Sequence, residues 1–303
     1  MSDPRSSTTD APRLAVLGAG TMGHGIAQVA AMAGYETRLF DLLPDALDAA
    51  RTRIESNLDN GIARGKVTPE AREQALGVLT FTSRLIEAAD GVEIAIEAVP
   101  EKLDLKRQVL GACAEAAAEG AVLATNTSSL SISRIAEGLP GPERVVGMHF
   151  FNPVHIMALV EIVRGAETSD ETVARTRGVA ERMGKTPIVI ADSPGFASSR
   201  LGVALGLEAI RMVEAGVASP EDIDTAMTLG YRHPMGPLKL GDLVGLDVRL
   251  DIARYLHGAL RSPVFEPPAL LERMVAEGRL GRKSGEGFYR WGEAGQLPTN
   301  PSE

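Results

Sequence analysis

The feature of this sequence that most constrains its fold is a glycine-rich turn directly after a short apolar run. Residues 13–17 have the pattern of a strand and lead straight into Gly-Ala-Gly-Thr-Met-Gly at 18–23. A helix-compatible stretch follows at 25–32, and a second strand-like run at 36–40 ends in Asp41. This strand–turn–helix–strand order predicts the first unit of a Rossmann-type, doubly wound α/β sheet.

Each glycine of the turn has a physical role in such a unit. Gly18 permits the sharp turn from strand to helix, and Gly20 lets the backbone approach a pyrophosphate. Gly23 allows the helix and the strand to pack closely. The start of the helix, with Thr21 and Met22, presents free N–H groups to the phosphates. Because these glycines stand between a strand and a helix, they predict a dinucleotide site.

Asp41 indicates which dinucleotide is bound. A carboxylate at the tip of the second strand can accept hydrogen bonds from both hydroxyls of an adenine ribose. Its charge repels a 2′-phosphate, and the following Leu42 and Leu43 offer no arginine to receive one. NAD is therefore the expected cofactor, in preference to NADP.

Polar residues also follow two later strand-like runs, at 92–98 and 121–125. In a doubly wound sheet such residues lie at the carboxyl edge, where ligands bind. The candidate cofactor contacts there are Glu101, Lys106, Asn126 and Ser128. For Glu101 and Lys106 the alternative is a solvated helix face.

Ser128 has two interpretations that the local sequence leaves open. Ser128 or Ser129 can be the N-cap of a helix at 131–137, with its hydroxyl accepting a backbone N–H. Alternatively, the Ser128 hydroxyl can project into the cleft as a hydrogen-bond donor to a substrate.

His149 and Glu161 form the candidate acid–base pair. His149 follows the apolar run 144–148, and Glu161 lies inside the next run, 158–163. If these runs are neighbouring strands, an imidazole and a carboxylate can face each other, as a general base and its orienting group require. The alternative is a hydrogen-bonded core histidine beneath two phenylalanines.

Composition excludes several classes of function. A chain of 303 residues is long enough for about two domains. Its net charge of −9 provides no basic field for nucleic acid or for an anionic membrane, so an anionic substrate requires a local basic patch. Cys113 is the only cysteine, which excludes a disulfide framework and a thiolate metal site, and no metal is expected.

Residues 1–11 are polar and have neither an apolar segment nor an Arg-rich amphipathic pattern, so we expect a disordered tail. No apolar run reaches the length of a transmembrane helix. The expected location is the cytoplasm, with no membrane partner.

The second half of the chain has a different pattern. After a last strand-like run at 188–190, the turn cluster 192–196 marks a boundary. We expect an NAD-binding domain at 12–191 and an all-helical substrate and dimerisation domain at 192–303. Helical patterns cover 201–216, 247–260, 268–277 and a segment with Ser219 as N-cap and Pro220 at its first position. The apolar surface of these helices predicts a homodimer.

Several longer motifs are specific enough to indicate a family. They are Gly-Ala-Gly-Thr-Met-Gly-His-Gly-Ile-Ala-Gln at 18–28, Ala-Thr-Asn-Thr-Ser-Ser-Leu at 124–130, His-Phe-Phe-Asn-Pro-Val at 149–154, Leu-Val-Glu at 159–161, Asp-Ser-Pro-Gly-Phe at 192–196, Pro-Met-Gly-Pro at 234–237 and Gly-Arg-Lys-Ser-Gly-Glu-Gly-Phe-Tyr at 281–289. With them the chain resembles the short-chain L-3-hydroxyacyl-CoA dehydrogenases, especially the bacterial 3-hydroxybutyryl-CoA type, from about residue 13 to residue 291.

The resemblance implies a role for each matching residue. His149 would be the catalytic base, Glu161 its orienting carboxylate, and Ser128 a contact to the substrate oxygen. Asn152 would lie near the nicotinamide, and Glu101, Lys106 and Lys283 would be further NAD contacts. The residues that contact CoA in the family fall near Asn57 and Arg64, with Lys66 an equally good candidate for the phosphates.

The chain departs from the family at two positions. Ser199 stands where the family usually has an active-site asparagine, and serine reaches less far and lacks an amide pair. Ala158 stands where relatives often carry lysine. The role of Ser199 and the acyl preference are therefore open.

The implied reaction is reversible oxidation of an L-3-hydroxyacyl-CoA, short-chain and 3-hydroxybutyryl-CoA-like, to the 3-ketoacyl-CoA with NAD. One alternative is a sister dehydrogenase that acts on a free hydroxy or sugar acid such as L-gulonate. Another is a non-catalytic dinucleotide-binding structural or sensor protein, against which the intact Ser128, His149 and Glu161 argue.

Overall fold

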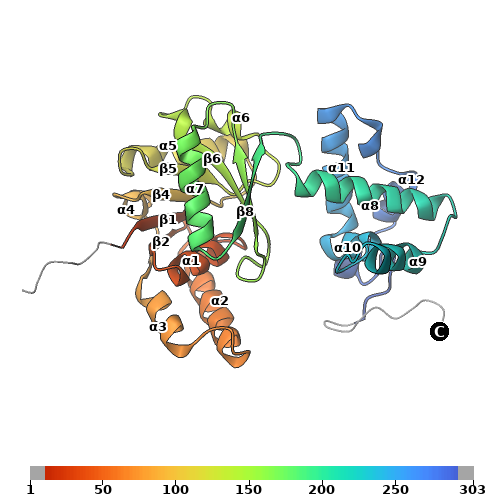
Figure 1. The fold of residues 1–303 in the computed structure, drawn as a ribbon, viewed down its shortest axis with the longest axis horizontal. Coiled ribbons are helices and arrows are strands. Elements are labelled where there is room, and N and C mark those ends of the chain that lie inside the picture. Colours follow the sequence, from red (N-terminus) through yellow and green to blue (C-terminus); the bar gives the residue numbers. More distant parts are fainter. Residues whose placement is uncertain (1–10, 293–303) are drawn as a thin grey trace, which may run out of the picture. The chain divides into compact units, whose positions relative to one another are not determined.

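The computed structural model describes residues 11–292, and its contacts divide the chain into two compact units between Ser193 and Pro194 (Figure 1). The N-terminal tail expected over residues 1–11 lies, apart from Ala11, outside the described residues. The division falls inside the turn cluster 192–196. Each unit has a hydrophobic core of its own.

The first unit is built on an eight-stranded sheet of order β3-β2-β1-β4-β5-β6-β7-β8. The strands are β1 (Arg13–Leu17), β2 (Glu36–Phe40), β3 (Leu79–Thr82), β4 (Ile94–Glu97), β5 (Val122–Thr125), β6 (Val145–Phe150), β7 (Leu159–Arg164) and β8 (Thr186–Ala191). From β3 to β6 neighbouring strands are parallel, whereas β7 runs antiparallel to β6 and β8 is parallel to β7. The reversal is possible because β6 and β7 are joined by the loop 151–158 and not by a crossover helix.

Helices cover both faces of this sheet. They are α1 (Gly23–Met32), α2 (Pro44–Ala63), α3 (Pro69–Gly77), α4 (Leu85–Ala89), α5 (Leu103–Ala116), α6 (Ile132–Ala136) and α7 (Asp170–Arg182). Buried residues of α1, α2 and α7 share one core with alternate residues of β1, such as Leu14 and Val16. The intervening Ala15 and Leu17 are also fully buried, and α4 and α5 contact β1 and β4 respectively. A parallel sheet with both faces buried is the expected doubly wound arrangement.

The pair α2–α3 lies between β2 and β3, where the sequence indicated no helix. Thr68 caps α3 by accepting a hydrogen bond from the Ala71 N–H at 3.1 Å, and Pro69 occupies the first position of the helix. The two helices carry many charged residues, and only Leu47, Ala50, Ile54 and Leu58 of α2 and Ala75 of α3 are buried. Their apolar faces are narrow, which explains why an apolar pattern did not reveal them.

The second unit consists of helices joined by turns, and in its described part the only strand-like pairings are two isolated bridges. Its helices are α8 (Ser198–Glu214), α9 (Pro220–Thr225), the π-helical turn η2 (Ala226–Gly230), α10 (Pro237–Val244), α11 (Leu246–Leu260) and α12 (Ala269–Ala276). Asp242 in α10 accepts hydrogen bonds from the N–H groups of Phe288 and Tyr289 and from Trp291 Nε1, which anchors the C-terminal segment. The α/β fold class followed by an all-helical domain is confirmed. No helix within 11–292 is long and apolar enough to span a membrane.

Candidate active site

His149 and Glu161 face each other across β6 and β7. They are direct partners in the antiparallel register, and His149 Nδ1 lies 2.8 Å from Glu161 Oε2. Glu161 is fully buried, His149 is 7% exposed, and the Phe151 ring lies 4.6 Å from the imidazole between centroids. With Nδ1–H donated to a carboxylate, the neutral imidazole carries its lone pair on Nε2, which suits a proton acceptor.

The glycine-rich turn is shaped for a pyrophosphate. Gly18 has φ +111°, and a Cβ there would lie 2.8 Å from the Ala98 carbonyl oxygen. A Cβ at Gly23 would overlap the carbonyl of Gly18, so the strand and α1 can approach only with glycine. Beside Gly20, by contrast, such a Cβ would have no atom of the described residues within 4 Å apart from those of Gly20 and its chain neighbours. Within residues 11–292 no side chain caps α1, so its first N–H groups can serve an anionic ligand.

Asp41 follows β2 and is oriented by the backbone. Its Oδ2 accepts the Ala19 N–H at 2.8 Å, and its Oδ1 accepts the Leu43 N–H at 3.0 Å. These bonds hold the carboxylate beside the glycine-rich turn while each oxygen keeps further acceptor capacity. The position fits the ribose contact expected from the sequence.

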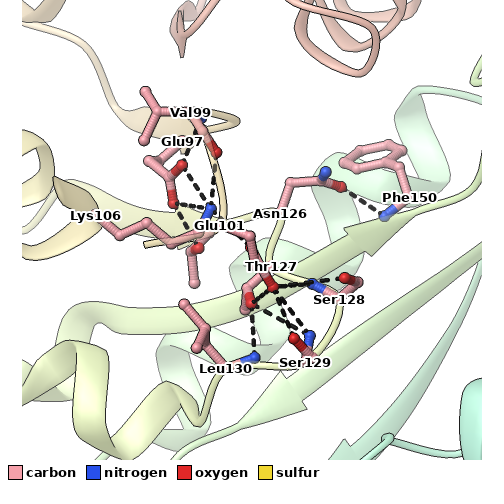
Figure 2. A network of polar contacts seen from close by, with 11 residues as sticks. Glu97, Val99, Glu101, Lys106, Asn126, Thr127, Ser128, Ser129, Leu130 and Phe150 are labelled. Atoms are coloured by element: carbon pink, nitrogen blue, oxygen red, sulfur yellow. Dashed lines mark hydrogen bonds and ion pairs between the residues drawn. The ribbon is translucent and has the colours of Figure 1, made fainter. Parts of the chain in front are cut away.

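At the ends of β4 and β5, Glu97, Lys106 and Glu101 form a charged network (Figure 2). Lys106 Nζ lies 2.8 Å from Glu97 Oε1 and 3.3 Å from Glu101 Oε2. Lys106 is 1% exposed and Glu97 is fully buried. Burial raises the pKa of Glu97, and Lys106, Thr125 and the Val99 N–H oppose that rise. The alternative of a solvated helix face is therefore wrong for Lys106.

Glu101 organises the turn that carries Ser128. Its Oε1 accepts hydrogen bonds from Thr127 Oγ1 at 2.5 Å, from Ser128 N at 3.0 Å and from Ser129 N at 3.1 Å. Burial would raise the pKa of Glu101, but the hydrogen bonds from Thr127 and Ser128 and the charge of Lys106 hold it below its ordinary value. The carboxylate is therefore the form that this turn favours.

The N-cap interpretation of Ser128 and Ser129 is wrong. The N-cap of α6 is Ser131, whose hydroxyl accepts the Arg134 N–H at 3.2 Å. Ser128 is exposed at the carboxyl edge of the sheet. Asn126 lies beside it, and its Oδ1 accepts the Phe150 N–H at 2.9 Å, which orients the side-chain amide (Figure 2).

A basic pocket of the first unit brings together the three residues expected to contact CoA. Asn57, Arg64 and Lys66 line a pocket of about 720 Å³. Sequence reasoning missed three further cationic or titratable residues of this pocket, which are His155, Arg182 and Lys185. Burial, together with the positive charges of His24, Lys185 and Arg64, lowers the pKa of His155. The pocket is thus a region of positive potential on an acidic chain.

Asn152 lines an adjoining pocket of about 430 Å³ together with Thr21 of the glycine-rich turn. Asn57 and His155 border both pockets, so the two share a wall. In the basic pocket, Ala158 stands where relatives often carry lysine, so the pocket lacks that cation.

Two expected site residues belong to the second unit. Ser199 is the second residue of α8, within the first turn of that helix. Lys283 lies in the 3₁₀ turn η4 (Arg282–Ser284), and its ammonium pairs with Asp247 at 2.5 Å. Their roles toward the ligands stay predictions.

No three His, Cys, Asp or Glu side chains within the described residues are grouped as a metal site requires. The strand–turn–helix geometry with Asp41 beside it is instead typical of NAD-dependent oxidoreductases, and that is the class of protein that the fold and the site define.

Comparison with known proteins specifies the family. Residues 13–193 match the family described as 3-hydroxyacyl-CoA dehydrogenase, NAD binding domain, and residues 195–291 match its C-terminal domain. The chain belongs to the 3-hydroxyacyl-CoA dehydrogenase family, and its cofactor is NAD. The resemblance inferred from the motifs is confirmed.

Similar proteins share nearly the whole chain. A 3-hydroxybutyryl-CoA dehydrogenase of Mycobacterium tuberculosis is 44% identical over 281 residues, covering 92% of this chain and 98% of the relative. The crystal structure of M. tuberculosis FadB2 matches with a TM-score of 0.87 and 44% identity, covering 93% of this chain and all (100%) of that one. The structure of (S)-3-hydroxybutyryl-CoA dehydrogenase PaaH1 from Ralstonia eutropha matches with a TM-score of 0.89 and 38% identity, covering 94% and 100%.

Proposed function

We propose that this protein catalyses the reversible oxidation of a short-chain L-3-hydroxyacyl-CoA, such as 3-hydroxybutyryl-CoA, to the 3-ketoacyl-CoA with NAD⁺. The observation that carries the proposal is the buried His149–Glu161 pair, which lies in the same unit as the dinucleotide turn. The names of the relatives support the substrate class.

His149 accepts the proton of the C3 hydroxyl through Nε2. Glu161 keeps the imidazole oriented and stabilises the imidazolium that forms, and general-base assistance of this kind contributes about 10²–10⁴-fold to a rate. NAD⁺, when bound, supplies the acceptor for the hydride that leaves C3. The loss of a proton and a hydride converts the hydroxyl into a carbonyl, and the reverse reaction returns the proton from His149.

Ser128 donates a hydrogen bond to the C3 oxygen and stabilises the negative charge that develops there. Ser199 assists from α8 in place of the asparagine usual in the family. Glu101 fixes the backbone of Ser128 and so determines where the hydroxyl points.

The cofactor contacts that we propose follow the sheet edge and the turn. They are Gly18, Gly20, Thr21, Met22, Gly23, Asp41, Glu101, Lys106, Asn126, Ser128, Asn152 and Lys283. In this arrangement Asp41 accepts hydrogen bonds from the adenine ribose, and the N–H groups at the start of α1 face the pyrophosphate.

The basic pocket holds the phosphates of CoA, with Arg64 and Lys66 as the principal cations and Asn57 as a polar contact. A net charge of −9 opposes binding of an anionic thioester at long range, so the recognition has to be local. We also propose a homodimer formed through the helical unit, where Leu201, Leu229 and Tyr231 are at least 71% exposed. A cytoplasmic location stays a prediction from the sequence.

The test is NAD⁺ reduction measured separately with 3-hydroxybutyryl-CoA and with L-gulonate. The expected result is turnover of the CoA ester alone. Turnover of L-gulonate alone would identify a sister dehydrogenase, and binding of NAD without turnover of either compound would identify a non-catalytic protein. A panel of C4 to C16 acyl-CoA substrates with 3-hydroxyadipyl-CoA then defines the chain length.

A further inference from the structure

His155 lies in the loop 151–158 and lines both the basic pocket and the adjoining pocket to which Asn152 contributes. It is exposed, and its imidazole has no hydrogen-bond partner within residues 11–292. Both ring nitrogens are therefore available to a ligand, as two donors in the charged form or as one donor and one acceptor in the neutral form. A titratable group thus lies where the two pockets meet.

The walls of the two pockets carry cations but no carboxylate. No Asp or Glu of the part of the chain that the structure describes lines either pocket. Without a counter-ion on these walls, the positive potential favours an anionic ligand. Besides His155, the basic side chains are those of His24, Arg53, Arg64, Lys66, Arg182 and Lys185.

One of these cations is already used by the loop that carries His155. The ammonium of Lys185 donates hydrogen bonds to the carbonyl oxygens of Val154 and Met157. Ala158, at the end of the same loop, lines the basic pocket but supplies no charge to it. His155 is therefore the side chain of the loop 151–158 that can add a positive charge to the pocket.

The charge of His155 depends on what surrounds its ring. Partial burial lowers the pKa of the imidazole, and the positive charges of His24 in α1, of Lys185 directly before β8 and of Arg64 at the C-cap of α2 lower it further. In the free protein the ring is therefore mostly neutral at pH 7. A phosphate dianion beside the same ring favours the charged form and raises its pKa.

We propose that His155 is a further phosphate-binding residue of the CoA site and that it takes up a proton from solvent when a CoA ester binds. The proposal rests on the proposed function, in which the basic pocket holds the phosphates of CoA. In the complex the imidazolium donates a hydrogen bond to a phosphate oxygen. The affinity for these phosphates is greatest below the pKa of the free ring and falls as the pH rises through the higher pKa of the bound ring.

The KM values of two thioesters separate this effect from the pH dependence of the reaction itself. 3-Hydroxybutyryl-CoA and the corresponding pantetheine thioester share the acyl end, so titration of His149 affects both, and the ratio of their KM values reports the phosphate contacts. Above about pH 6.5 the phosphates of CoA are mostly ionised. From there to about pH 8.5 we expect KM for the CoA ester, relative to the pantetheine ester, to rise about three-fold, the effect of one exposed ion pair. A ratio that does not depend on pH would overturn the proposal.

Two substitutions at His155 should fix the ratio at opposite values. His155→Gln cannot become charged, so its ratio should stay at the high value that wild type reaches at about pH 8.5. His155→Lys stays charged, because lysine titrates near pH 10.4, so its ratio should stay low throughout. The matched control is His257→Gln in α11, which lines neither pocket and should keep the wild-type profile. If His155→Gln keeps that profile, or if the control loses it, the proposal fails.

Proton NMR of the imidazole rings gives a readout that does not depend on turnover. Butyryl-CoA lacks the C3 hydroxyl, so its binding can be followed without oxidation. It should raise the pKa of His155 by at least about 0.5, the difference that a three-fold change in affinity requires, and butyryl-pantetheine should not. The resonance is identified by its absence in His155→Gln.

An unchanged pKa of His155 in the presence of butyryl-CoA would contradict the proposal even if the enzyme oxidises 3-hydroxybutyryl-CoA. A raised pKa in a protein that does not oxidise 3-hydroxybutyryl-CoA would support the phosphate contact, while the proposed reaction fails. The two failures are therefore distinguishable.

Discussion

At the scale of single residues, His149 carries the most direct prediction. His149→Gln keeps a polar side chain at the end of β6 but removes the group that accepts the proton. We expect kcat to fall by at least about 100-fold, because general-base assistance is worth that much or more. Steady-state kinetics measure the change, and the Kd for NAD should stay as in wild type. Near-normal kcat in this variant would show that His149 is not the catalytic base.

Ser199 tests the position at which the chain departs from its family. Ser199→Asn restores an amide that reaches further than a hydroxyl. We expect kcat/KM for 3-hydroxybutyryl-CoA to rise about two- to twelve-fold, the effect of one hydrogen bond of about 0.5–1.5 kcal/mol, with no change in NAD binding. If the kinetics are the same across the C4 to C16 panel, Ser199 is simply a residue of the first turn of α8.

Single residues also show how far sequence reasoning reaches. The pairing of His149 with Glu161 could be anticipated, because each lies at or within an apolar run and a sheet brings such runs together. Burial of Glu97 and Lys106 could not be anticipated, because a lysine in the first turns of a helix is usually solvated and only the tertiary fold shows its partners. The signal available in hindsight is a glutamate that ends a strand of otherwise apolar residues, β4.

At the scale of elements, the turn between β5 and α6 depends on the ionised form of Glu101. Because the fold lowers the pKa of Glu101, its stabilising contribution is complete above the unfolded value, about 4.3, and is lost as the pH falls through the lower folded value. We expect acidification from pH 7 to pH 3 to reduce the free energy of unfolding more in wild type than in Glu101→Gln. Urea denaturation at each pH measures the difference.

A surface glutamate of the same unit serves as the control for this pH dependence. Glu119→Gln changes an exposed residue beyond the end of α5 and should keep the wild-type response to acid. If Glu101→Gln also keeps that response, the carboxylate of Glu101 does not stabilise the turn.

Strands could be predicted from the sequence where an apolar run is buried on both faces of the sheet. The ends of β1 and β2 agree with the ranges expected from the sequence, and α11 (Leu246–Leu260) begins one residue before the expected start. The sequence did not indicate α2, α3 or α10. Nor did it predict that β7 reverses direction, because strand direction depends on how the chain returns to the sheet and not on the composition of the strand.

At the scale of the whole molecule, the attraction of the basic pocket for an anionic substrate has to overcome the repulsion from the net negative charge of the chain. Arg64→Gln with Lys66→Gln removes two cations from the pocket. We expect KM for 3-hydroxybutyryl-CoA to rise about ten-fold and to depend less on salt, because exposed charges near anionic phosphates are screened by ions. KM for the corresponding pantetheine thioester, which lacks the nucleotide phosphates, should not change.

The matched control for the pocket is Arg84→Gln, which removes an exposed cation paired with Glu87 and outside the pocket. It should leave both KM values unchanged. An equal rise in KM for the CoA and pantetheine thioesters in the Arg64/Lys66 variant would mean that these cations act on the acyl end or on folding, and the pocket would not be the phosphate site.

The antiparallel pairing of β6 and β7 has a consequence for how new specificities can arise on this scaffold. His149 and Glu161 are aligned by the hydrogen-bond ladder of the sheet, and a shift of β7 by a single residue would turn Glu161 to the face opposite His149. The hairpin segment 155–158 contributes to the basic pocket but not to that ladder. Insertions or exchanged sequences in this segment can therefore diversify ligand choice while the proton-transfer chemistry is inherited intact, which makes it the natural place to begin laboratory evolution of a new substrate range.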